Sequence, residues 1–161
     1  SDLRRMPQFK NVKTLFLKNY ITTIKQAIEH VFDMGWDVIA IDSIAEVIEM
    51  YKDTYKTTES AAELWLLDLQ TKHKKGDNKG TKYTAFVNIQ QVTKAGDFAG
   101  SNRLKHMTDA MCHVTRIKDS ADRKVHFSKN RDCDTDNAIM FRIGLNQVEY
   151  SFEAIENDSE E

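Results

Sequence analysis

The hydrophobic pattern of this 161-residue chain changes its period partway along the sequence. Before residue 110, apolar residues either recur at helical spacing, as in Ile24, Ile28 and Val31, or form short runs such as residues 38–41. From Met111 onward, apolar and polar residues alternate, which is typical of antiparallel strands. The change predicts an α/β fold in which a parallel sheet, with helices on both faces, is extended by C-terminal antiparallel strands.

The segments before residue 110 predict the order β-α-β-α-β. The run VIAI at 38–41 is short and rich in β-branched residues, so we expect a strand buried on both faces. Thr22 or Thr23 is expected to cap the first helix, Gly35 to end it, and Thr58 to begin the second. The remaining expected segments are strands at 12–17 and 83–89, a short helix or turn at 44–51, polar loops at 52–58 and 92–102, and a short helix at 103–111.

The later segments predict a β-meander and an acidic end. The four strands expected in the meander are 111–117, 124–128, 138–143 and 147–152. The acidic residues 154–161 predict a disordered tail, and residues 1–153 are expected to form one domain.

Composition limits the functions that the chain can have. No apolar run reaches the roughly 18 residues of a membrane helix, so no membrane partner is expected. Cys112 and Cys133 form no CxxC pair; two thiols suit a reducing cytoplasm, and Cys112 is expected in the core. The net charge is -2, so binding to nucleic acid would need a local basic patch. The six glycines frame neither a GxxxxGK[ST] nor a GxGxxG motif.

Asp42 and Gln91 are the candidate catalytic residues at the ends of two expected strands. Ligands of open α/β sheets bind at the carboxyl edge of the strands, where an aspartate can hold Mg²⁺, directly or through water, beside nucleotide phosphates. The alternative is that Asp42 caps the next helix. Gln91 could sense a γ-phosphate or orient water, or it could be a satisfied amide at a strand end.

Basic residues form three further candidate sites. The loops at 52–56 and 94–100 are expected at the same sheet edge as Asp42, where they suit contact with a phosphate backbone. The alternative is that they are plain surface loops. Lys129-Asn130-Arg131 follows an alternating strand, and its two cations could clamp phosphates. The alternative is a solvated turn in which the cations pair with Asp132 and Asp134.

Three stretches, read in order, resemble the RadA (Sms) branch of the RecA-family ATPases. They are VIAIDSI at 38–44, which looks like a Walker-B strand, QVTKAGDFAGSNRLKHMTD at 91–109, and SKNRDCDTDN at 128–137. The resemblance covers roughly residues 10–152, and the middle stretch is the most specific. It departs from the family at Asp132-Cys133, where RadA proteins carry Phe-Gly.

The resemblance implies a partial RecA-like P-loop ATPase core from a DNA-dependent ATPase of homologous recombination and DNA repair. Its cofactors would be ATP and Mg²⁺. Its partners would be single-stranded or branched DNA, further copies in a ring or filament, and a recombinase. The Walker-A loop and a water-activating glutamate are expected upstream of residue 1. A DnaB-type replicative helicase and a non-catalytic RecA-like regulatory paralogue are the alternatives.

The resemblance also implies a role for each candidate residue. Asp42, Gln91 and Arg131 would be catalytic, with Asp42 on the metal. Ser43, Lys129 and Asn130 would bind nucleotide, and Lys129 and Arg131 would reach the nucleotide of the adjacent subunit. The residues implied in DNA binding are Lys52, Lys56, Lys94, Arg103 and Lys105.

Overall fold

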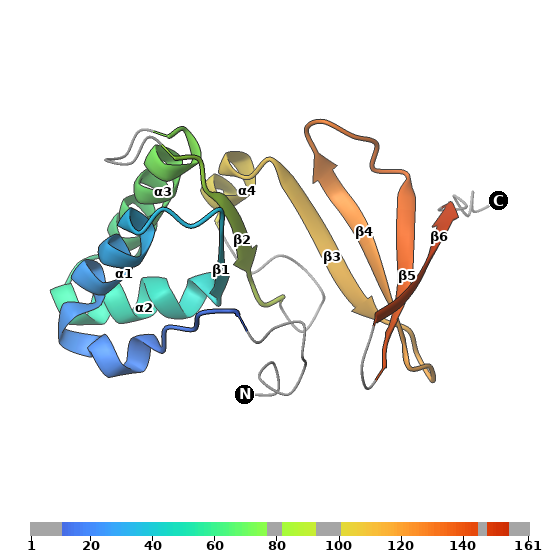
Figure 1. Cartoon of the computed structure of the whole chain (residues 1–161), viewed down its shortest axis with the longest axis horizontal. Coiled ribbons are helices and arrows are strands. Elements are labelled where there is room, and N and C mark those ends of the chain that lie inside the picture. The colour runs from blue at the N-terminus through green and yellow to red at the C-terminus, as the bar shows by residue number, and fades with distance from the viewer. Residues whose placement is uncertain (1–10, 77–81, 93–100, 145–147, 155–161) are drawn as a thin grey trace. The chain divides into compact units, whose positions relative to one another are not determined.

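The computed structural model describes residues 11–76, 82–92, 101–144 and 148–154. The chain divides into two compact units, which are described separately (Figure 1). We call Lys13–Leu104 the parallel unit, and Lys105–Glu161 with Ser1–Val12 the antiparallel unit. The first holds a two-stranded sheet and the second a four-stranded sheet, so the expected mixed α/β class is confirmed. Within the described ranges, no helix is long and apolar enough to cross a membrane.

The parallel unit consists of helices around a pair of parallel strands. Its elements are the 3-10 helix η3 (Leu17–Thr23), α1 (Ile24–Asp33), β1 (Val38–Asp42), α2 (Ile44–Tyr55), α3 (Glu59–Lys74), β2 (Ala85–Ile89) and the start of α4 (Asn102–Met107). β1 and β2 pair in register from Val38 opposite Ala85 to Asp42 opposite Ile89. The carboxyl ends of both strands therefore lie side by side.

The signals at Gly35 and Thr58 are confirmed, whereas Thr23 precedes α1 without a capping hydrogen bond from its side chain. Gly35, with φ of +71°, follows the end of α1, in a conformation that glycine adopts easily. Thr58 caps α3, since its hydroxyl accepts a hydrogen bond from the amide of Ala61 at 3.2 Å. α2 is longer than expected, however, and Lys52 lies in its last turn rather than in a loop.

One face of the β1–β2 pair carries the core, and the other is open. The buried core draws on every helix from α1 to α4 and on β1; its residues are Ile24, Ile28, Phe32, Ile39, Ile44, Val47, Ile48, Ala62, Leu66, Leu67 and Leu104. Figure 1 shows α1, α2 and α3 on one side of the pair. Val38 and Val87 stay 59% and 52% exposed. The expectation of a strand buried on both faces, with helices on both, is thus wrong for the described residues.

The expected strand at 12–17 is also wrong. Residues 12–16 have no regular structure, and η3 begins at Leu17. Val12 and Phe16 are about half exposed, at 53% and 51%. A short apolar run indicates a strand only where a partner strand is available, and neither β1 nor β2 pairs with this segment.

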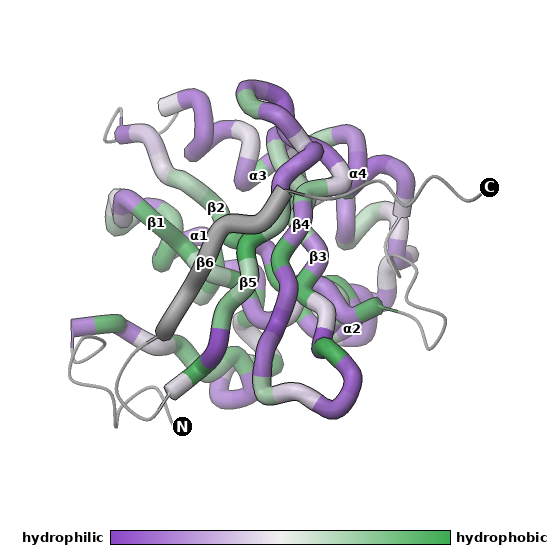
Figure 2. The backbone as a smooth tube through the Cα atoms, turned by 90° about the vertical axis from the view of Figure 1, so that its right-hand side faces the viewer, coloured by the Kyte–Doolittle hydropathy of each residue, from purple (hydrophilic) through white to green (hydrophobic). Residues whose placement is uncertain are grey.

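The antiparallel unit is a meander, as the alternating pattern predicts. Its strands are β3 (Ala110–Arg116), β4 (Asp122–Asn130), β5 (Asn137–Ile143) and β6 (Val148–Ala154), in the order β3-β4-β5-β6. Hydrophilic and hydrophobic stretches occur along β3, β4 and β5 (Figure 2). Among the residues of β3, β4 and β5, Ala138 is the one buried hydrophobic residue. Cys112 is exposed, so its expected core position is wrong, because no described core forms on its sheet.

Candidate nucleotide and nucleic-acid sites

Asp42 and Ser43 have different environments at the carboxyl end of β1. Ser43 is 5% exposed, and its Oγ accepts a hydrogen bond from the amide of Glu46 at 3.4 Å, so Ser43 is the N-cap of α2. The peptide bond between the two residues is cis. Asp42 is exposed, and no hydrogen bond or ion pair of its carboxylate is recorded within the described ranges. The helix-capping alternative therefore applies to Ser43 and not to Asp42.

Two glutamines follow β2 at the same sheet edge. Ile89, the last residue of β2, lies opposite Asp42, so Gln90 and Gln91 continue the chain past this edge. Gln91 is exposed, whereas the Oε1 of Gln90 is buried without a hydrogen-bond partner among the described residues. The structure thus brings the strand ends of Asp42 and Gln91 together, and it adds Gln90, for which the sequence offered no signal.

A reciprocal amide pair holds β2 on α3. The Nε2 of Gln70 donates to the Oδ1 of Asn88 at 2.9 Å, and the Nδ2 of Asn88 donates back to the Oε1 of Gln70 at 3.1 Å. Asn88 precedes the strand end by one residue. The pair therefore positions the segment that leads to Gln91, and nothing in the spacing of Gln70 indicates it.

The donor set at this edge fits Mg²⁺ held with a nucleotide. Mg²⁺ in nucleotide sites is usually bound by one or two carboxylates, substrate phosphates and water. Asp42 supplies one exposed carboxylate. The described residues contain no group of three or more histidines, cysteines or carboxylates that would hold a metal by itself. Asp42 could therefore hold the metal together with phosphates and water.

Lys129 and Arg131 bind the end of α4 and the residues after it. The Nζ of Lys129 donates to the carbonyl oxygens of Lys105 at 2.9 Å, His106 at 3.2 Å and Thr108 at 2.6 Å. Arg131 pairs through Nη1 with the Oδ1 of Asp109 at 2.9 Å, and its amide donates to the Asp109 carbonyl at 3.0 Å. In the described conformation, both cations are used within the chain.

Arg131 does not form the ion pair with Asp132 or Asp134 that the alternative interpretation predicts. Arg131 contacts Asp109, which lies more than 20 residues earlier, rather than Asp132 or Asp134. Asn130 accepts a hydrogen bond from the amide of Asp132 at 3.4 Å, and so stabilises the turn itself. The alternative of a turn neutralised by its own aspartates is therefore not what the structure contains.

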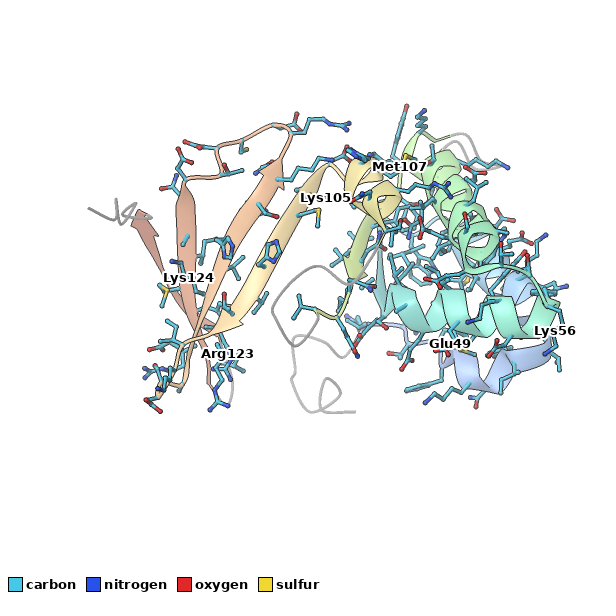
Figure 3. All side chains as sticks on the ribbon, turned by 180° about the vertical axis from the view of Figure 1, so that it is seen from behind. Glu49, Lys56, Lys105, Met107, Arg123 and Lys124 are labelled. Carbon is cyan, nitrogen blue, oxygen red and sulfur yellow. The ribbon has the colours of Figure 1, made fainter. Side chains whose placement is uncertain are left out.

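The DNA-binding candidates do not share one edge. α2 starts at the Asp42 edge and runs 12 residues, so Lys52 and Lys56 lie up to roughly 18 Å along its axis from that edge. Figure 3 shows Lys56 at the end of α2 and Lys105 on α4. The expectation that the 52–56 segment lies at the Asp42 edge is wrong because the segment is mostly helix. Lys94 lies outside the described residues.

α4 is anchored on α3 by polar contacts. The Nη1 of Arg103 donates to the carbonyl oxygen and the Oγ of Ser60, both at 3.5 Å. Ser101, at the start of α4, donates to Glu63 at 2.5 Å. Arg103 thus has a structural contact, whereas Lys105 is exposed.

A histidine pair lies across β3 and β4. His113 is opposite His126, and their rings stack with centroids 5.1 Å apart. The Nε2 of His113 also forms a hydrogen bond with the Oγ of Ser128 at 2.8 Å. Burial, followed by the charges of His113 and Lys124, lowers the pKa of His126. The sequence spacing of the histidines gave no hint of this pair.

No protein-family model matches the chain, and no curated protein is significantly similar to it. A functional proposal must therefore stand on the geometry described above and on the three sequence stretches that resemble RadA.

Proposed function

We propose that the chain is part of a RadA-like, DNA-dependent ATPase that acts in homologous recombination and DNA repair. The observation that carries the proposal is the exposed carboxylate of Asp42 at the carboxyl end of a parallel strand, where Ser43 already caps the next helix. A carboxylate at this edge without a structural partner is suited to a metal-bound nucleotide. The resemblance of the stretches at 38–44, 91–109 and 128–137 to RadA supports the choice of family.

The roles of the edge residues follow from their chemistry. When bound, Mg²⁺ neutralises charge on the β- and γ-phosphates of ATP. Asp42 would hold the ion, directly or through water, and Gln91 would orient a water molecule near the γ-phosphate. Hydrolysis also needs a phosphate cradle, and these 161 residues contain no GxxxxGK[ST] motif. We therefore expect this chain by itself to bind nucleotide with Mg²⁺ but not to hydrolyse it.

Lys129 and Arg131 are proposed to act on nucleotide held by a neighbouring subunit, with Asn130 beside them. Both cations would first have to leave the carbonyl oxygens after α4 and the carboxylate of Asp109. Hydrogen bonds to charged groups contribute about 1.5–3 kcal/mol each, so nucleotide phosphates must replace contacts of comparable strength. Binding of a neighbour's nucleotide would thus release the C-terminal end of α4.

A second candidate is a RecA-like regulatory protein without catalysis. The same contacts of Lys129 and Arg131 favour it, because cations that only stabilise α4 have no need of a nucleotide. In that case Asp42 would be an ordinary surface carboxylate.

Mg²⁺-dependent nucleotide binding tests the proposal and separates the two candidates. Binding of a fluorescent ATP analogue is measured by anisotropy with and without Mg²⁺, for the wild type, Asp42→Asn and Asp37→Asn. Asp37 is the matched control, since it is exposed and precedes the amino end of the same strand. We expect Mg²⁺ to tighten binding in the wild type and in Asp37→Asn but not in Asp42→Asn. The same response in all three proteins, or none in the wild type, would contradict the proposal.

A further inference from the structure

Two arginines lie directly opposite each other near the turn between β3 and β4. The register places Arg116 of β3 across from Arg123 of β4. Like charges in this position destabilise an antiparallel pair. Residues 116–124 contain four cations and two carboxylates, although the whole chain has a net charge of -2. The turn end of the β3–β4 hairpin is therefore positively charged, although the chain as a whole is slightly negative.

The nearest carboxylate on the strand has another partner. Arg142 donates to both oxygens of Asp122, through Nε at 2.8 Å and Nη2 at 3.1 Å. This guanidinium and the hydroxyl of Ser120 lower the pKa of Asp122. Asp122 lies opposite Arg142 in the register and so on the sheet face away from Arg123. Its charge is already balanced by Arg142.

The arginines themselves have few contacts. Arg123 donates from Nη1 to the carbonyl oxygens of Ala121 and Asp122, at 3.0 and 3.1 Å. Its charge also helps to lower the pKa of Asp122, but no direct ion pair of Arg123 is found among the described residues. Arg116 is exposed, and no hydrogen bond or ion pair is recorded for it within the described ranges. Both guanidinium groups therefore have donors available for an anion.

Next to the two arginines, the same sheet face is apolar. Because side chains alternate between faces, Val114, Val125 and Phe127 share the face of Arg116 and Arg123. Phe141 lies opposite Arg123 on β5, and Ile139 lies opposite Val125. Val114 is 62% exposed. Figure 3 shows Arg123 on the ribbon near the turn that joins β3 and β4.

We propose that this face binds single-stranded nucleic acid. Guanidinium groups contact phosphate oxygens in pairs of hydrogen bonds, and aromatic side chains on an open sheet stack on unpaired bases. A duplex keeps its bases stacked inside and would reach only the arginines. The inference deepens the DNA binding of the proposed function, on which it rests for its ligand, and adds a surface that the resemblance to RadA does not indicate.

The test is binding of a fluorescein-labelled 20-nucleotide single strand by anisotropy between 50 and 200 mM NaCl. Arg116→Gln/Arg123→Gln should weaken binding about ten-fold and reduce the slope of log affinity against log salt by about 1.4, which is two phosphate contacts. Arg116→Lys/Arg123→Lys should keep the slope. Phe141→Leu should weaken binding roughly five-fold with an unchanged slope. Lys25→Gln/Lys72→Gln, on two helices of the parallel unit, is the charge-matched control and should behave as the wild type.

Separate arms distinguish this inference from the proposed function. Arg103→Gln/Lys105→Gln removes the cations that the family resemblance implies. If only that variant loses binding, the sheet face is not the site, although the proposed DNA binding survives. Equal affinity for a 20-base-pair duplex, together with no effect of Phe141→Leu, would also overturn the inference. DNA and uridine-only RNA strands of the same length identify the natural source, and unchanged thermal unfolding shows that each variant is folded.

Discussion

Ser43, and not Asp42, is the N-cap residue of α2. Ser43→Ala removes the acceptor of the Glu46 amide, so the free energy of unfolding should fall by about 1 kcal/mol. Urea denaturation followed by far-UV circular dichroism measures the change. Ser43→Thr retains a hydroxyl, so its free energy of unfolding should fall by less than that of Ser43→Ala. Equal stability of Ser43→Ala and the wild type would mean that the cap contributes nothing, and the argument for a free Asp42 would weaken.

His126 gives the antiparallel unit a pH dependence. Its pKa in the folded protein lies below the usual 6.5, because burial and the charges of His113 and Lys124 disfavour the imidazolium. The unfolded chain therefore binds the proton at higher pH than the folded chain, so stability is full above pH 6.5 and decreases as the pH falls through that value. His126→Asn should lose less stability than the wild type between pH 7.5 and 5.5 in urea titrations. Identical pH slopes would contradict this.

Lys129 acts at the scale of an element, because it links β4 to the end of α4. Lys129→Met removes a cation that three carbonyl oxygens share, and we expect a loss of about 1 kcal/mol and faster hydrogen exchange in α4. Lys124→Met, on the same strand, is the matched control, since no carbonyl contact of Lys124 is recorded in the described ranges. Equal exchange rates in both variants would show that α4 does not depend on Lys129.

Elements with local signals could be predicted from the sequence. Thr58 and Gly35 mark helix ends through their own side chain or backbone, and the alternation after Met111 shows the four strands. The run at 12–17 has the same apolar character as 38–41 but forms no strand. The difference lies in pairing, which depends on distant residues. The exposed face of β1 is likewise set by where the helices pack.

In the candidate site, too, features with a local sequence signal could be predicted, whereas contacts between distant residues could not. Asp42 ends β1 and Gln91 lies two residues after the end of β2, so both are near the expected sheet edge, while their roles stay predictions. The contacts of Lys129 join residues 21 to 24 positions apart, and no spacing rule reaches that far. The unpaired Oε1 of Gln90 and the Gln70–Asn88 pair depend on packing and left no trace in the sequence.

At the scale of the whole molecule, the open apolar face of β1 and β2 should make the chain self-associate. Among the described strands, β1 and β2 pair only with each other, so each has an edge that can add a strand from another copy. Light scattering at increasing concentration should show oligomers for the wild type and fewer for Val87→Lys, a position that is 52% exposed. Leu64→Lys, on α3, is the control and should associate as the wild type does. A monomer at all concentrations would contradict the expectation.

If Asp42 faces the metal of a bound nucleotide, Mn²⁺ in place of Mg²⁺ should broaden the amide signals around Asp42. Mn²⁺ replaces Mg²⁺ and broadens the NMR signals of nuclei close to it. With ATP present, the amides of Asp42, Ser43 and Gln91 should broaden first in the ¹⁵N-labelled wild type and in Asp37→Asn, and remain sharp in Asp42→Asn. Broadening that centres on other residues, or that persists unchanged in Asp42→Asn, would contradict the account.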